Sequence, residues 1–88
     1  MFPNKLDGAT VLYYTSQGDY GYSNFPDGSI ADRYRYLAIC KYSNDDKHYL
    51  FCCDENYEVV SDMLHDSIDE CMTTALQYKE NIVWNKMQ

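Results

Sequence analysis

The sequence lacks any apolar run that approaches the roughly 20 residues required to cross a membrane. Its first eight residues, MFPNKLDG, also lack the apolar stretch of a secretory signal peptide. We therefore expect a cytoplasmic protein that does not engage a membrane. Because the cytosol is reducing, we expect the four cysteines to be free thiols rather than a disulfide framework.

Basic residues are scarce, since seven lysines and arginines oppose fourteen acids and the formal net charge is −7. Residues 1–44 contain four charges of each sign, whereas residues 45–88 contain ten acids and only three bases. The whole net charge therefore falls in the second half. An acidic half repels nucleic acid and anionic lipid and attracts basic surfaces. The charge disfavours a nucleic-acid binder and favours a basic protein as the partner.

The familiar motifs of catalysis and metal binding are also missing. The segment GDYGYSNFPDGS contains glycine but matches neither the P-loop nor the dinucleotide fingerprint. A cysteine nucleophile would have no nucleophile elbow or oxyanion loop beside it. The residues that could be counted toward a zinc site are His48, Cys52, Cys53 and His65. Cys52 and Cys53 are adjacent, and a strand points adjacent side chains to opposite faces, so both cannot bind one ion. We therefore expect buried cysteines, no enzyme activity, no cofactor and no metal.

What is present is typical of one folded domain spanning residues 1–88, with 45% hydrophobic and 16% aromatic residues. Runs of β-branched and aromatic residues predict strands in ATVLYYT, RYRYLAICKY, HYLFCC and YEVVS. The glycines of SQGDYG predict that the first run turns back as a hairpin, and FPDGS predicts a tight turn. SNDDK and DEN are expected to be loops.

A single helix is predicted near the end of the chain. Ser67 and Glu70 have the spacing of a capping box, which marks the start of a helix. An apolar stripe at helical spacing follows, and the helix is expected to run to about Lys79; the stripe consists of Ile68, Cys71, Met72, Ala75 and Leu76. His65 is expected in the loop before the helix, and NIVWNKM as a short strand or a packed tail.

These elements predict an α+β fold: an antiparallel meander sheet of four to five strands, with one C-terminal amphipathic helix on one face. The strands RYRYLAICKY and HYLFCC are apolar or aromatic on both faces, yet one helix can cover only one of them. Two explanations remain open. Either the sheet curls to enclose its second face, or that face is a binding surface rich in tyrosine.

Tyrosine is abundant, with ten residues in 88, and most lie in the predicted strands and hairpins. Tyrosine provides stiff, amphipathic contact area and is enriched at binding hot spots. We expect the acidic hairpins SNDDKHY and CDENY to form one contact surface with nearby tyrosines. The predicted partner-binding residues are Tyr42, Asp45, Asp46, Tyr49, Asp54, Glu55 and Tyr57.

The strings GDYGYSNF, YLFCCDENYEV and DSIDECM resemble pieces of an uncharacterised bacterial family to which no activity can be attached. In size, acidity and tyrosine content, the chain is similar to the small cytoplasmic immunity proteins that bacteria pair with secreted toxins. This resemblance implies a protein that binds a toxin domain and blocks its active site or substrate surface, and it assigns no residue. The alternatives are a nucleic-acid mimic that inhibits a DNA- or RNA-binding protein, and a small protein with a cysteine or metal site.

Overall fold

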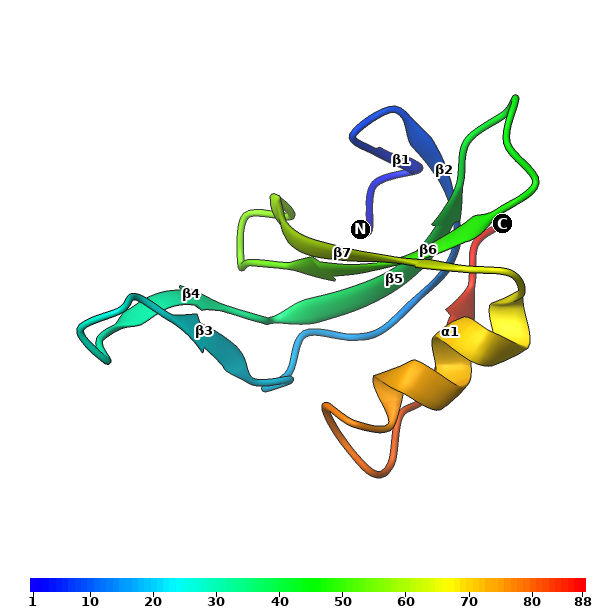
Figure 1. Ribbon diagram of the computed structural model, residues 1–88. Coiled ribbons are helices and arrows are strands. Elements are labelled where there is room, and N and C mark those ends of the chain that lie inside the picture. Colours follow the sequence, from blue (N-terminus) through cyan, green and yellow to red (C-terminus); the bar gives the residue numbers. More distant parts are fainter.

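The computed structural model describes residues 1–88 and shows an α+β fold, a curled antiparallel sheet with one short helix against it (Figure 1). The main sheet has the strand order β1-β2-β5-β6-β7, and β8 pairs with β2. Strands β3 and β4 form a separate ribbon. The elements are β1 (Lys5–Leu6), β2 (Ala9–Tyr14), β3 (Tyr22–Asn24), β4 (Ile30–Arg33), β5 (Tyr36–Lys41), β6 (His48–Cys53), β7 (Val59–His65), α1 (Ile68–Ala75) and β8 (Asn85–Lys86). The predicted fold class is confirmed.

The first hairpin differs from the prediction. Strand β2 turns back on β1, which precedes it, through Asp7 and Gly8 at φ values of 48° and 81°. Both residues of this two-residue turn therefore have the positive φ that a type I′ hairpin requires. On its other edge β2 pairs with β5. The segment after β2 does not form a hairpin but runs beside the start of β5, where the amide of Gly18 donates to the carbonyl of Arg35 at 2.9 Å.

Helix α1 begins as predicted, because the Ser67 hydroxyl accepts a hydrogen bond from the amide of Glu70 at 3.1 Å. It ends at Ala75, four residues before the expected Lys79. The amide of Tyr78 donates to the carbonyl of Ala75, and its hydroxyl reaches the sulfur of Met63 at 3.6 Å. This tight turn packs Tyr78 against the sheet and leaves Leu76 exposed instead of on the buried stripe. The helix has eight residues, and no helix of the protein could cross a membrane.

Other local predictions have a similar mixture of outcomes. The FPDGS turn joins β3 to β4, and SNDDK and DEN fall in loops. NIVWNKM contains the short strand β8. His65 is the last residue of β7 rather than a loop residue, and it lies opposite His48 of β6.

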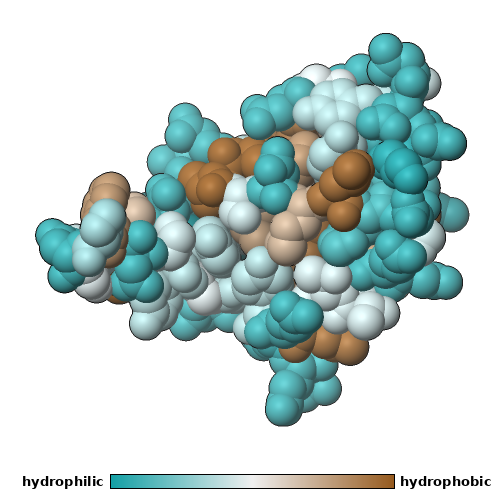
Figure 2. Space-filling model, in the orientation of Figure 1, coloured by the Kyte–Doolittle hydropathy of each residue, from teal (hydrophilic) through white to brown (hydrophobic).

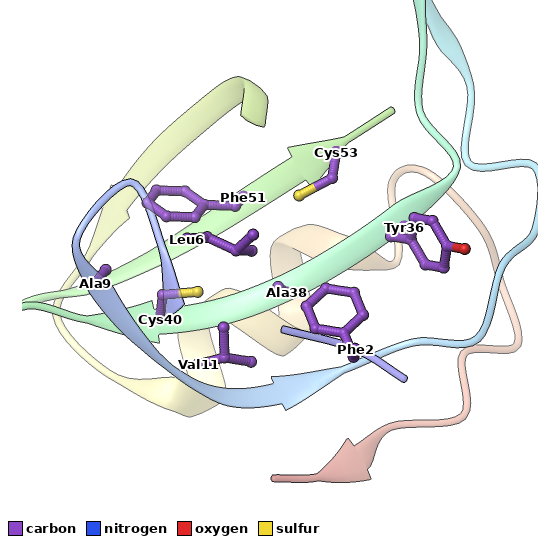
Figure 3. Close-up of a cluster of buried hydrophobic side chains, with 9 residues drawn as sticks. All are labelled: Phe2, Leu6, Ala9, Val11, Tyr36, Ala38, Cys40, Phe51 and Cys53. Atoms are coloured by element: carbon purple, nitrogen blue, oxygen red, sulfur yellow. The ribbon is translucent and has the colours of Figure 1, made fainter. Parts of the chain in front are cut away.

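Both faces of the sheet are buried. On the helix side the core consists of Tyr20, Leu37, Ile39, Leu50, Cys52, Cys71 and Ala75. On the other side the N-terminal residues fold over the curled sheet and complete a second cluster, which we call the interior cluster (Figure 3). It consists of Phe2, Leu6, Ala9, Val11, Tyr36, Ala38, Cys40, Phe51 and Cys53. The second face is thus enclosed by curling. The prediction that β5 and β6 have apolar side chains on both faces is confirmed.

Candidate functional site

Strand β6 separates the seven predicted binding residues into two groups. The loop before it contains Asp45 and Asp46, and the loop after it contains Asp54 and Glu55. Six residues of strand span about 20 Å, so these loops lie at opposite ends of the sheet (Figure 1). The structure therefore does not bring the seven residues together at one place.

We call one region the acidic end; it comprises residues 42–49 and 65–70. The two segments meet because His48 pairs with His65 and because the Lys47 ammonium forms an ion pair with Asp66. The Asp66 carboxylate raises the pKa of Lys47, and Lys47 in turn lowers the pKa of Asp66. The region holds one lysine, and its carboxylates are Asp45, Asp46, Asp66, Asp69 and Glu70. Folding thus joins acids that lie some 20 residues apart in sequence.

The acidic end contains two tyrosines, Tyr42 and Tyr49. The rings of Tyr42 and Tyr49 meet edge to face, with centroids 5.4 Å apart, and both are half-buried against the interior cluster. The Tyr42 hydroxyl donates to the carbonyl of Asp7 at 3.1 Å, and the Tyr49 hydroxyl donates to Asp45 at 3.4 Å. Burial and the nearby Asp45 raise the pKa of Tyr49. Packing and hydrogen bonds therefore hold both rings in place, with Tyr49 beside the Asp45 carboxylate, as rigid contact residues require.

The other region, which we call the arm end, contains the β3–β4 ribbon and the loop of residues 54–58. The ribbon, residues 22–33, forms an arm that projects from the sheet in Figures 1 and 2. Its turn is closed by the amide of Phe25 donating to the carbonyl of Ser29 at 2.8 Å. Tyr22 and Phe25 are each 54% exposed, and Ile30 is 40% exposed. A two-stranded ribbon is only marginally stable in water, so exposed apolar side chains there suggest a contact surface.

Sequence reasoning missed Tyr22, Phe25 and Ile30 as surface residues. The available signal was the FPDGS turn, which has apolar residues on both sides and strands too short to reach the core. At the base of the arm, Arg33 and Arg35 share a depression of about 220 Å³ with Asp54 and Glu55. Asp54 and Glu55, together with Asp32, therefore lie beside two cations, whereas the five carboxylates of the acidic end have one lysine among them.

Tyr57 has a structural role in the loop at the arm end. Its ring stacks on Tyr36 with centroids 4.7 Å apart and meets Phe2 edge to face at 5.3 Å. Its backbone has φ 64°, a conformation that a non-glycine residue adopts only when its surroundings hold it. The hydrogen bond between the two hydroxyl groups raises the pKa of Tyr36 to about 12. Tyr57 thus helps to close the interior of the curled sheet.

The cysteines and histidines do not converge on a chemical site. Cys52 lies in the helix-side core and Cys53 in the interior cluster, so the four residues considered for zinc are spread over two faces. No group of three or more histidine, cysteine or acidic side chains is arranged to hold a metal ion. All four cysteines are free and buried, and burial raises the pKa of Cys52 and Cys71 to about 11 and of Cys53 to about 12. A thiol that stays protonated at neutral pH is a poor nucleophile.

The chain matches no protein-family model, no curated protein and no solved structure in the comparisons made with it. Its function is therefore inferred from the chemistry of its own surface.

Proposed function

We propose that this protein binds a basic protein, such as a toxin domain or an enzyme, and blocks it, as an immunity or inhibitor protein does. The observation that carries the proposal is the acidic end, which holds five carboxylates and one lysine together with the ordered pair Tyr42 and Tyr49. Clustered carboxylates speed the encounter with a basic surface. Ordered tyrosine rings then provide contact area at a low cost in conformational entropy.

Binding rather than catalysis is also favoured by the state of the reactive groups. The thiols are buried with raised pKa values, and the acids at both ends are exposed or half-exposed, in loops, in the β3–β4 ribbon and in the first turn of α1. A general acid or base works at neutral pH only when burial or a neighbouring charge moves its pKa toward 7. The loop acids lack such burial.

The alternative of a nucleic-acid mimic makes a different structural demand. A mimic presents carboxylates along one surface in place of phosphates, whereas here one strand length separates the acids of the two ends, and those of the arm end lie beside arginines. This arrangement supports the inhibitor over the mimic.

The proposal is tested by capturing the partner from a lysate of the source organism and measuring the binding of the purified partner. We expect a basic protein whose activity falls on binding, and an affinity that is partly retained at high salt. Replacing Tyr42 or Tyr49 by alanine should speed dissociation, with a loss of about 2 kcal/mol of binding free energy. Binding that vanishes as salt rises, to a protein that also binds nucleic acid, would establish the mimic instead. A captured partner that is acidic, or whose activity does not fall on binding, would overturn the proposal.

A further inference from the structure

Strand β7 is an outer edge of the main sheet, with one β-bulge between Val59 and Ser61. In the order β1-β2-β5-β6-β7, only β6 pairs with it, and its other side has no strand. The strand is seven residues long, VVSDMLH, and contains no proline, glycine or lysine. Natural proteins usually block such an edge with lysine, proline or a very short strand, because its free backbone groups can pair with another chain.

The backbone groups that face outward on β7 can be identified from the hydrogen bonding of β6. The carbonyl of Cys53 accepts a hydrogen bond from the amide of Arg35, so the backbone N–H and C=O groups of Cys53 point toward β5. Because an antiparallel ladder alternates and the β5–β6 register is regular, Phe51 and Tyr49 also bond toward β5. Their partners on β7 are Asp62 and Leu64. The N–H and C=O groups of Asp62 and Leu64 therefore point away from the sheet.

The surroundings of this edge indicate what kind of strand would fit. A depression of about 210 Å³ between the β1–β2 turn and β7 is lined by Asp7, Val59, Val60, Ser61 and Asp62. Figure 2 shows brown, hydrophobic surface interrupted by teal over the part of the sheet where β7 lies. The only charged residues in the lining are the acids Asp7 and Asp62, and Leu64 beyond them is 55% exposed. The edge therefore combines free backbone groups, apolar side chains and negative charge.

We propose that the outer edge of β7 pairs with an extended segment of the partner in which basic and apolar residues alternate. The inference rests on the proposed function, because the segment belongs to the same basic partner. Backbone pairing would supply affinity, and the alternating side chains would supply specificity. Asp62 and Leu64 lie on one face of β7, and Met63 lies on the other. Basic side chains of the segment would lie toward Asp7 and Asp62 on the first face, and apolar ones toward Met63 on the second.

The test uses the full chain and a synthetic peptide of alternating lysine and valine, seven residues long, with capped ends. Hydrogen exchange measured by NMR should slow at the amides of Asp62 and Leu64 by about tenfold at saturating peptide. A second peptide has the same sequence, with every other amide N-methylated on its pairing edge. It keeps the charge and the side chains but cannot donate the ladder hydrogen bonds, so it should bind at least about tenfold more weakly.

Two protein variants locate the site. Leu64→Pro removes an outward N–H without removing a hydrogen bond to β6 and should weaken peptide binding by about tenfold, whereas Leu64→Thr keeps the N–H and should weaken it less than about threefold. Equal affinity of the two peptides, exchange protection at other residues, or no binding of either peptide would overturn the inference. If Leu64→Pro does not fold, the two peptides on the unaltered protein still decide. A captured basic partner that binds wild type and Leu64→Pro equally would refute edge pairing but leave the proposed function intact.

Discussion

The two ends of the sheet use the same residue types in different ways. The acidic end contains five carboxylates and one lysine, which pairs with Asp66. Its two tyrosines are half-buried and are held by hydrogen bonds. At the arm end, Asp54 and Glu55 lie beside two arginines, Tyr57 is packed into the interior, and apolar side chains are exposed on a projecting ribbon. A tyrosine close to acids in the sequence therefore lies at a half-buried surface at one end and against the closed interior at the other.

The difference shows why a count of charge along the chain does not locate a surface. Asp45 and Asp54 are nine positions apart but lie at opposite ends of β6, whereas Asp45 and Asp66 are 21 positions apart and share one end. The spatial neighbours are set by strand pairing.

The largest expected effect concerns the closure of the interior at the arm end. Phe2 is 6% exposed and contacts the rings of Tyr14, Tyr36 and Tyr57. Phe2→Ala should lower the free energy of unfolding by about 3 kcal/mol, because it leaves a cavity among aromatic rings. Urea unfolding measures this loss. The control Phe25→Ala, on the exposed arm, should change stability by less than about 0.5 kcal/mol; losses of equal size in the two variants would show that Phe2 does not seal the interior.

A smaller effect per side chain is expected at alkaline pH. Burial holds the folded-state pKa of Cys52 and Cys71 at about 11 and of Cys53 at about 12, above the usual value of 9.0. These raised values mean that the unfolded chain releases thiol protons first, so stability is complete below pH 9 and falls as the pH rises toward 11. Each of these three thiols should contribute a loss on the order of 2 kcal/mol by pH 10.5.

Chemical unfolding at a series of pH values measures this dependence, and thiol labelling at pH 8 provides an independent check. All four cysteines should react only after unfolding, because each is buried. Rapid labelling of the native protein, or stability that rises between pH 9 and 10.5, would contradict this assignment.

The smallest stability effect lies at the acidic end. Ser67→Ala removes the hydroxyl that accepts from the Glu70 amide and should cost about 1 kcal/mol. Thr74→Ala is a matched control within the same helix, since its side chain has no such capping role and alanine favours a helix. A thermal or urea midpoint that is the same for Ser67→Ala and wild type would place the start of the helix elsewhere.

Local features of the fold could be predicted from the sequence because they depend on neighbours in the chain. The alternation along β5 and β6, the Ser67 cap and the FPDGS turn follow from residue type and spacing. The Asp7–Gly8 hairpin also has a strong local signal, which was overlooked. The pairing of β2 with β5 and the closure by Phe2 depend on long-range contacts, which no local pattern specifies.

The division of the candidate site was partly predictable as well. Successive hairpins of an antiparallel meander lie at opposite ends of the sheet, so SNDDKHY and CDENY could not form one surface. What the sequence could not predict is the meeting of Lys47 with Asp66, because it depends on where β7 ends and α1 begins. The exposed side chains of the arm had a local signal in the FPDGS turn, but only the structure shows that nothing packs on them.

The central claim, that the acidic end guides the basic partner, is tested most directly by two charge-reversed variants. Asp45→Lys with Asp46→Lys alters the acidic end, and Asp54→Lys with Glu55→Lys makes the same change in net charge at the arm end. Association rate constants with the captured partner are measured for both by stopped flow. The acidic-end variant should associate about tenfold more slowly than wild type, and the arm-end variant should differ less than about twofold. Equal slowing of both variants, or slowing of the arm-end variant alone, would contradict the assignment.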